Sequence, residues 1–316
     1  MKHGLTVDNL VIHSGENVLV RGVHFHVPAG KIVALIGESG SGKSLTAKAI
    51  MGLLPHTLKA TGSMAFNGKP LDTLSTRERT RHMAMVFQEP MTSLNPCFRV
   101  GYQITERVAL EESLRVKERR QFGITLLGQV GIDNPEWRYD QFPHELSGGM
   151  RQRVMIAMAL ASQPQLIIAD EPTTALDVAV QWKVMRLFQQ IIEEKNLSLL
   201  FITHDIALAS QISEVLLVMY AGRIIEAGAL DHVVKQPLHP YTKSLLNCLP
   251  ERMFSDQFVS ICGVPPRNLN GLSGCAFAPR CPVAQPRCHV EVPEWSGTVE
   301  CGYECHFPLR HGDVCR

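Results

Sequence analysis

The sequence GESGSGKS at residues 37–44 constrains the fold more than any other stretch of this chain. It fits the pattern G-x-x-x-x-G-K-S, and it stands between an apolar, β-branched run at 31–36 and a helical pattern at 43–54. Glycines let backbone N–H groups approach a phosphate group, and the first turn of a helix adds a favourable partial charge. The sequence therefore predicts a buried parallel strand, a phosphate-binding loop and a helix. The loop residues expected to contact phosphate are Gly37, Glu38, Ser39, Gly40, Ser41, Gly42, Lys43 and Ser44.

Two side chains of the loop and two acids farther along the chain carry the expected chemistry. Lys43 supplies a positive charge to the outer phosphates, and the Ser44 hydroxyl is placed to hold Mg²⁺. The apolar run 166–169 ends in Asp170, a second Mg²⁺ ligand, and Glu171, which we expect to polarise the attacking water. A glycine-rich turn without a ligand and a surface acidic pair are the simpler interpretations, and finding both motifs in one chain disfavours them.

Strand and helix patterns alternate along most of the chain. Apolar strand patterns at 166–169, 198–202 and 215–220 are separated by helical patterns, which is typical of an α/β fold with a parallel sheet. After residue 249 the composition changes to proline, cysteine and arginine with little periodicity. The expected organisation is a nucleotide-binding domain at 1–249, with a helical subdomain at about 95–160, and a small cysteine-containing unit at 250–316.

Composition excludes several classes of protein. The 316 residues are 45% hydrophobic and carry a net charge of +1, so no overall attraction to nucleic acid is expected. The N-terminus lacks the apolar core of a secretory signal, and no apolar run approaches the roughly 20 residues that cross a bilayer. We expect a cytoplasmic chain that associates with a membrane only through partners.

Four further motifs resemble those of one protein family. LSGGMRQR at 146–153 resembles the signature motif of ABC-transporter ATPases, which other P-loop enzymes lack. Gln88 resembles the Q-loop glutamine of that family, ALD at 175–177 its D-loop, and His204 its switch histidine. With the two phosphate-site motifs, six motifs follow the order of the family between residue 5 and about residue 230.

The resemblance implies a P-loop NTPase fold and ATP hydrolysis. In this family two subunits pair head to tail, and each ATP lies between the phosphate loop of one subunit and the signature motif of the other. ABC ATPases usually stack adenine on an aromatic side chain upstream of the loop, where this chain offers only His13. The implied catalytic residues are Glu171, His204 and Gln88; the further nucleotide contacts are Ser147, Gly148, Gly149, Asp170, Asp177 and His13; the Mg²⁺ ligands are Ser44, Gln88 and Asp170.

Two stretches narrow the resemblance to one branch of the family. FQEPMTSLNP at 87–96 and PLHPYTKSLL at 237–246 resemble the ATPases of oligopeptide, dipeptide and nickel importers. This implies a second, different ATPase subunit, two integral-membrane permease subunits, an extracytoplasmic solute-binding protein, and a location on the cytoplasmic face of the inner membrane. Four apolar residues are expected either to contact a permease or to pack the helical subdomain: Phe87, Met91, Leu94 and Phe98.

Alternative functions differ in cargo or in class. Peptide is the favoured cargo because of the long cysteine-bearing tail, and nickel or another metal chelate is the alternative. A non-transport ABC ATPase acting on DNA or ribosomes usually has two ATPase units, coiled-coil arms or strong basic patches, which this sequence lacks. A redox-sensing module is a third hypothesis, supported only by the nine cysteines.

The cysteines fall into two groups. Cys97, Cys248 and Cys262 are expected to pack as small hydrophobic side chains. The tail cysteines lie in a segment with few core-forming residues, which often needs a metal, but their spacing matches neither common zinc sites nor ferredoxins. Iron–sulfur, zinc, free thiols and disulfides therefore stay open, although reduced thiols are usual in the cytosol. Resemblance to the peptide-importer tail implies a [4Fe–4S] cluster on Cys275, Cys281, Cys288 and Cys305, with Cys301 as a competitor for the fourth position.

Overall fold

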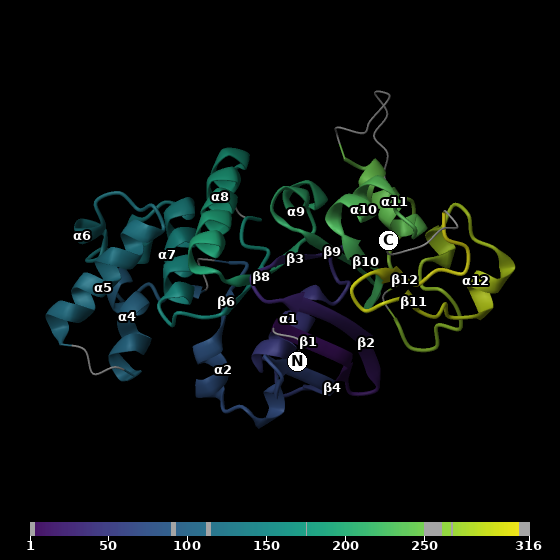
Figure 1. The fold of residues 1–316 in the computed structure, drawn as a ribbon, viewed down its shortest axis with the longest axis horizontal. Coiled ribbons are helices and arrows are strands. Elements are labelled where there is room, and N and C mark those ends of the chain that lie inside the picture. The colour runs from purple at the N-terminus through teal and green to yellow at the C-terminus, as the bar shows by residue number, and fades with distance from the viewer. Residues whose placement is uncertain are drawn as a thin grey trace. The chain divides into compact units, whose positions relative to one another are not determined.

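The chain forms two compact units in the computed structural model. One unit comprises Met1–Thr73 with Phe201–Arg316, and the other comprises Leu74–Leu200 (Figure 1). The structure describes residues 4–89, 93–111, 115–174, 176–249, 261–266 and 268–309, without the side chains of 109–111. The expected helical subdomain falls inside the second unit. The division into domains at residue 249 stays a prediction.

An antiparallel sheet in the order β2-β1-β4-β5 begins the first unit. The β4–β5 hairpin turns at Asn67 and Gly68, whose φ angles of 49° and 79° suit a tight two-residue turn, as the Asn-Gly pair predicts. One face of β1 is buried while the other is partly exposed, which is the usual pattern of an antiparallel sheet. The strands are β1 (Gly4–Ser14), β2 (Asn17–Pro28), β4 (Leu58–Phe66) and β5 (Lys69–Pro70).

A second sheet carries the phosphate loop. Its strand β3 (Ile32–Ile36) is wholly buried and pairs in parallel with β9 (Val215–Tyr220), which confirms the two strands expected from apolar runs. β10 (Arg223–Ala229) then pairs antiparallel with β9, so this sheet is mixed rather than purely parallel. The tail extends the same sheet, because β12 (Gly302–Tyr303) pairs with β10 and β11 (Ser296–Gly297) pairs with β12 (Figure 1).

Helix α1 follows the phosphate loop and is shorter than expected. It spans Lys43–Met51 and ends where Gly52 adopts a left-handed conformation with a φ of 72°, as a helix C-cap, whereas the sequence predicts an end at Pro55. The other helices of this unit are α9 (Ile206–Ile212), α10 (Leu230–Lys235), α11 (Pro240–Asn247) and α12 (Pro286–Val290), with short 3₁₀ turns η1 (Leu71–Thr73) and η4 (Ala278–Arg280).

A buried acid and a buried histidine hold the start of α11 in place. The Glu226 carboxylate accepts hydrogen bonds from the backbone N–H groups of Leu238, at 2.7 Å, and His239, at 3.0 Å. Burial raises the pKa of Glu226 to about 7 and lowers the pKa of His239 to about 3. The neutral imidazole accepts the backbone N–H of Tyr241 at 3.0 Å, so this network fixes Tyr241.

The second unit combines a parallel strand pair with helices. β6 (Met83–Val86) pairs in parallel with β7 (Leu166–Asp170), and β8 (Ser198–Thr203) carries the chain from this unit back into the first. The four-residue β6 was not expected from the sequence, because it is too short to leave a clear pattern. The helices are α2 (Thr76–His82), α4 (Val100–Glu111), α5 (Val116–Gln129), α6 (Pro135–Arg138), α7 (Gly148–Leu160) and α8 (Val178–Lys195), with the 3₁₀ turn η2 (Pro143–Glu145).

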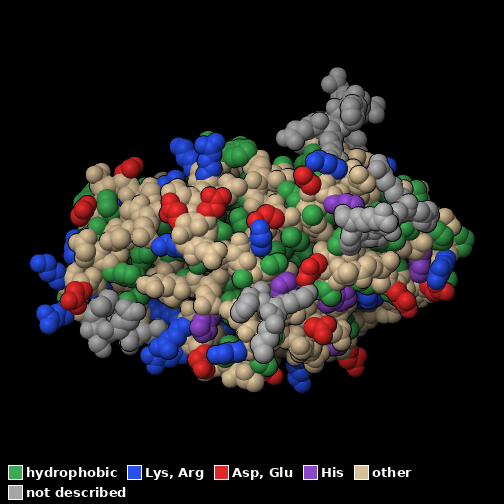
Figure 2. Space-filling view, viewed as in Figure 1, with side chains coloured by type: hydrophobic (Ala, Val, Ile, Leu, Met, Phe, Trp, Pro, Cys, Tyr) green, Lys and Arg blue, Asp and Glu red, His purple; other side chains and the backbone are tan. Residues whose placement is uncertain are grey.

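The surface carries charges of both signs. On the face shown in Figure 2, Lys and Arg side chains are interspersed with Asp and Glu side chains, in keeping with the net charge of +1. Among the described residues, no helix is both long and apolar enough to span a bilayer.

Candidate nucleotide-binding site

The phosphate loop joins β3 to α1 and packs against β9. A Cβ atom at Gly37 would lie 2.1 Å from the Met219 carbonyl oxygen, so only glycine fits at this position. Gly42 has a φ of 107°, and a Cβ there would approach the Met219 side chain to 2.8 Å. The sequence expectation of a strand, a glycine loop and a helix is therefore confirmed. Packing requires glycine at position 37, and the positive φ favours glycine at position 42.

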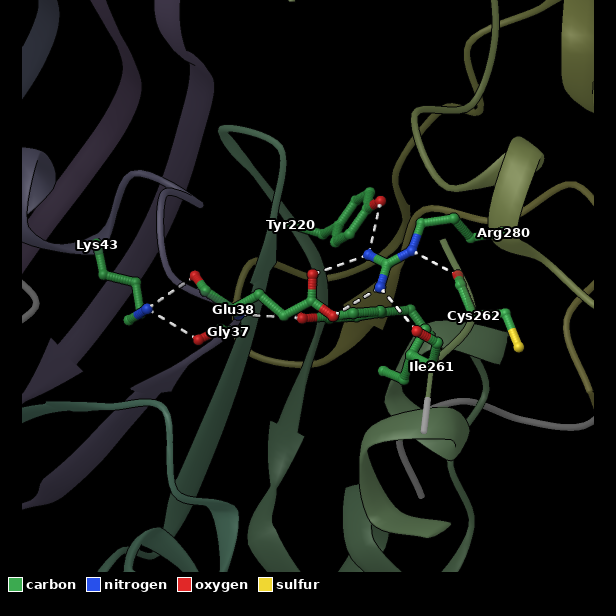
Figure 3. A network of polar contacts seen from close by, with 8 residues as sticks. Gly37, Glu38, Lys43, Tyr220, Ile261, Cys262 and Arg280 are labelled. Carbon is green, nitrogen blue, oxygen red and sulfur yellow. Dashed lines mark hydrogen bonds and ion pairs between the residues drawn. The ribbon is translucent and has the colours of Figure 1, made fainter. Parts of the chain in front are cut away.

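Lys43 holds the loop through its backbone. Its buried ammonium group donates to the carbonyl oxygens of Gly37, at 2.8 Å, and Glu38, at 3.0 Å (Figure 3). The Ser41 hydroxyl is buried, and it has no hydrogen-bond partner within the part of the chain that the structure describes. Because buried polar groups are nearly always paired, a hydroxyl of this kind in such a loop fits contact with a phosphate oxygen.

The expected magnesium ligands come from both compact units of the chain. Ser44 stands in the first turn of α1, and Asp170 is buried at the end of β7. Hydroxyl and carboxylate oxygens are the ligands that Mg²⁺ prefers, so the donor types fit. A shared ion on Ser44, Asp170 and Gln88 stays a prediction.

Glu171 and Gln88, two of the expected catalytic residues, are in contact in the second unit. Gln88 Nε2 donates to Glu171 Oε2 at 3.3 Å, and Thr174 Oγ1 donates to the same oxygen at 2.9 Å. Glu171 has a positive φ of 46°, which is uncommon for a non-glycine residue and is typical of functional sites. The carboxylate is thus oriented by two neutral donors and can accept a proton from water. Thr174 was missed from the sequence, although it follows Glu171 in the same turn.

Two helix N-termini carry the signature and D-loop residues. Ser147 caps α7 by accepting the Met150 N–H at 3.3 Å, and Asp177 caps α8 by accepting the Val180 N–H at 2.9 Å. Ser147 and Gly148 are exposed, so the positive end of α7 is open to an anion. Of the expected D-loop, Ala175 lies outside the described residues.

The two signature glycines have different neighbours, which predicts different effects of a methyl group. A Cβ at Gly149 would lie 2.6 Å from Val180 Cγ1, whereas a Cβ at Gly148 would meet Leu176 at an ordinary 3.7 Å. We expect Gly149→Ala to lower the free energy of unfolding by about 1–3 kcal/mol. Gly148→Ala should unfold like the parent but lose about tenfold or more of its ATPase turnover, because the methyl group blocks the helix end. Thermal unfolding and steady-state turnover check both, and parent-like turnover in Gly148→Ala would contradict the assignment.

His204 and His13 are located, but their roles stay predictions. His204 is exposed directly after β8. His13 lies in β1, where it is opposite Val18 of β2 and Lys59 of β4, and its side chain is half-exposed. An imidazole at this position can stack on a base, but more weakly than a larger ring.

The four tail cysteines are free thiols and electrostatic neighbours. Cys288 is buried, while Cys275, Cys281 and Cys305 are half-buried. Burial, with a contribution from the three other thiols, raises the pKa of Cys305 to about 12. Burial also raises the pKa values of Cys275 and Cys281, and the charge on Cys288 adds to both.

Backbone N–H groups point at three of the sulfur atoms. The donors are Phe277 and Ala278 for Cys275, Val283 for Cys281 and Phe307 for Cys305. Such bonds favour the thiolate form that a metal requires. Within the described residues, however, no three His, Cys, Asp or Glu side chains form a group that could hold a metal ion.

The remaining cysteines correct two expectations. Cys97 and Cys262 are exposed, so they do not pack as small hydrophobic side chains, whereas Cys248 is half-buried and donates to the Ser244 carbonyl. Cys301 is disulfide-bonded, so the expectation of reduced thiols is wrong there, and Cys301 does not compete for the fourth position.

Comparisons with known proteins agree with the motifs along the chain. The family described as "ABC transporter" matches residues 20–174, and the family described as "Oligopeptide/dipeptide transporter, C-terminal region" matches residues 225–288. The dipeptide transport ATP-binding protein DppD of Escherichia coli is 43% identical over 96% of this chain and 97% of its own length. The oligopeptide transport ATP-binding protein OppD of Bacillus subtilis is 45% identical over 85% of this chain and 77% of its own length.

Solved structures share the fold of the nucleotide-binding part. The ATP-binding cassette MJ0796, in a dimeric post-hydrolysis state with ADP and Pi, superposes with a TM-score of 0.63 at 27% identity, covering 72% of this chain and 98% of that one. The cbiO1 subunit of the Clostridium perfringens cbiONQ transporter gives 0.65 at 27% identity, covering 74% and 91%. The chain belongs to the ABC transporter family as an ATP-hydrolysing subunit of the oligopeptide/dipeptide branch.

Proposed function

We propose that this subunit energises the import of dipeptides or oligopeptides across a membrane. The observation that carries the proposal is the 43% identity to a dipeptide transport ATP-binding protein over nearly the whole chain, tail included. Nickel or another metal chelate is the alternative cargo. A non-transport ATPase is a more distant alternative function.

The proposed assembly has ATP between two ATPase subunits beneath two permeases. The exposed N-terminus of α7, with Ser147 and Gly148, suits contact with a phosphate on a partner subunit. The partner is a second, different ATPase, and a solute-binding protein delivers the cargo. The subunit then lies at the cytoplasmic face of the inner membrane as a peripheral protein, and removal of the γ-phosphate lets the pair separate.

Exposed aromatic side chains of the second unit are the proposed permease contact. Phe98 is 46% exposed and stacks on Tyr102, itself 40% exposed, at 5.2 Å, and Phe87 is 39% exposed. Leu94 is only 2% exposed, so it packs in the interior and is no part of the contact surface, contrary to one expectation. Met91 lies outside the described residues. Exposed aromatic side chains of this kind are enriched in protein interfaces.

The test is reconstitution of the complete transporter in lipid vesicles. ATP turnover is expected to rise when a solute-binding protein loaded with peptide is added, and not when the same protein is loaded with a nickel chelate. A Phe98→Ser variant should lose this stimulation while it still binds ATP. Stimulation by the chelate alone would favour the nickel alternative, and turnover insensitive to both would argue against import.

We also propose that Cys275, Cys281, Cys288 and Cys305 hold an iron–sulfur cluster. The proposal is supported by four free, neighbouring thiols and by backbone N–H groups aimed at three of them. A single zinc ion held by the same thiols, at about 2.3 Å from each sulfur, is the alternative. A cluster would supply a fixed cross-link within a tail that has little apolar core.

Metal analysis of anaerobically purified protein tests the cluster. We expect about four iron and four sulfide ions per chain with broad visible absorbance, lost in Cys288→Ser and retained in Cys97→Ser. Cys97 is the matched control because it is a free thiol in the other unit. Iron-free, colourless protein would contradict the proposal, and one zinc ion per chain would favour the alternative.

A further inference from the structure

Glu38, the second residue of the phosphate loop, is held at each of its polar groups. Its backbone N–H donates to the Tyr241 hydroxyl at 3.1 Å, and its carbonyl oxygen accepts from Lys43 at 3.0 Å. Its carboxylate accepts from both terminal nitrogens of Arg280, at 2.8 and 3.0 Å (Figure 3). Two of the three partners, Tyr241 and Arg280, come from the last third of the chain, which therefore determines how this loop residue is oriented.

Every N–H group of the Arg280 guanidinium donates a hydrogen bond. Besides Glu38, it donates to the Tyr220 hydroxyl at 3.2 Å and to the carbonyl oxygens of Cys262, at 3.0 Å, and Ile261, at 3.4 Å. These bonds use all five N–H donors of an arginine, and the side chain is only 5% exposed. A lysine offers a compact charge without this planar fork, so the arrangement is specific to arginine.

The aromatic residues around Arg280 are buried and pack closely on one another. Phe277 precedes the 3₁₀ turn that ends at Arg280, and its ring packs on Tyr220 and Tyr241 at centroid distances of 5.4 and 5.3 Å. All three rings are at most 1% exposed. Tyr220 ends β9 and Tyr241 is the second residue of α11, so this aromatic cluster holds the tail directly beside the loop.

The negative charge on Glu38 links its contact with Arg280 to nucleotide binding. A carboxylate in a loop that receives an anionic triphosphate repels it, and a bidentate arginine both cancels that charge and fixes its direction. We propose that Arg280 is a positioning residue for ATP binding: it acts through Glu38 to keep the phosphate loop electrostatically open to the nucleotide. The inference rests on ATP binding at Gly37–Ser44, and it needs neither the peptide cargo nor the metal cluster.

The first measurement compares ATP affinity and turnover in the full-length protein. Arg280→Met retains a long apolar side chain but removes the charge, and we expect the Kd for ATP to rise about tenfold or more. Turnover at saturating ATP should change by less than about threefold, because Arg280 touches no reacting atom. Arg280→Lys keeps the charge without the fork and should fall between the parent and Arg280→Met.

The decisive variant removes the repelling carboxylate as well. Glu38→Gln combined with Arg280→Met should bind ATP more tightly than Arg280→Met alone, whereas a merely structural arginine would give no such rescue. Arg223→Met is the matched control, because Arg223 makes a bidentate pair with Glu304, at 2.7 and 2.8 Å, that ties the tail to β10 instead of to the loop. We expect this control to bind ATP like the parent.

Three results would overturn the inference. The first is unchanged ATP affinity in Arg280→Met, and the second is a double variant that binds no better than the single one. The third is an equal loss in Arg223→Met, which would attribute the effect to attachment of the tail in general. If the unaltered protein failed to bind ATP, the ATP-binding function itself would be wrong. That result is distinguishable from failure of the Arg280 proposal, because it is seen without any variant.

Discussion

Replacing Glu171 by glutamine is expected to lower ATP turnover by about 10²–10⁴-fold while ATP still binds. Gln88 and Thr174 both donate to one oxygen of Glu171, so the amide oxygen of a glutamine can keep both hydrogen bonds. What the substitution removes is the proton acceptor for the attacking water. The paired ATPase subunits should then remain closed on uncleaved ATP, because release requires loss of the γ-phosphate. Steady-state turnover and nucleotide binding, measured on the same preparation, check both effects.

The matched control for this prediction is Glu193→Gln. Glu193 is an exposed carboxylate on α8 in the same unit, so the substitution makes the same chemical change away from the site. It should leave turnover and binding as in the parent. Native turnover in Glu171→Gln would show that another group accepts the proton, and loss of ATP binding would show that Glu171 has a structural role instead.

Local patterns in the sequence were sufficient for much of the α/β core. The strands β3 and β9 were both expected from short apolar runs, and α8 (Val178–Lys195) is one of the helices expected between the strand patterns. These features share one physical basis: buried strands and amphipathic helices impose a period on their own residues.

Contacts between distant segments were not predictable from the same patterns. Arg280 and Glu38 are 242 residues apart, and neither residue type indicates the other. The pairing of β12 with β10 involves only two residues of each strand, too few for an alternating pattern. The expectation that Cys97 and Cys262 are packed was wrong for a related reason: both are exposed, and burial depends on what the rest of the chain places around a residue.

Replacing Lys43 by alanine is expected to weaken ATP binding by about 10–150-fold and to lower turnover in parallel, since a hydrogen bond to a charged group contributes about 1.5–3 kcal/mol. Lys43 also donates to the carbonyl oxygens of Gly37 and Glu38, so the loop loses an internal support together with the charge. Lys43→Met keeps most of the buried side-chain stem but removes the ammonium group. It therefore separates loss of the charge and its hydrogen bonds from loss of packing. Lys48→Ala, in the last turn of the same helix, is the control and should bind ATP like the parent. Nucleotide titration of the three variants decides the matter: equal affinity in Lys43→Met and the parent would mean that the lysine charge contributes nothing to holding the phosphates.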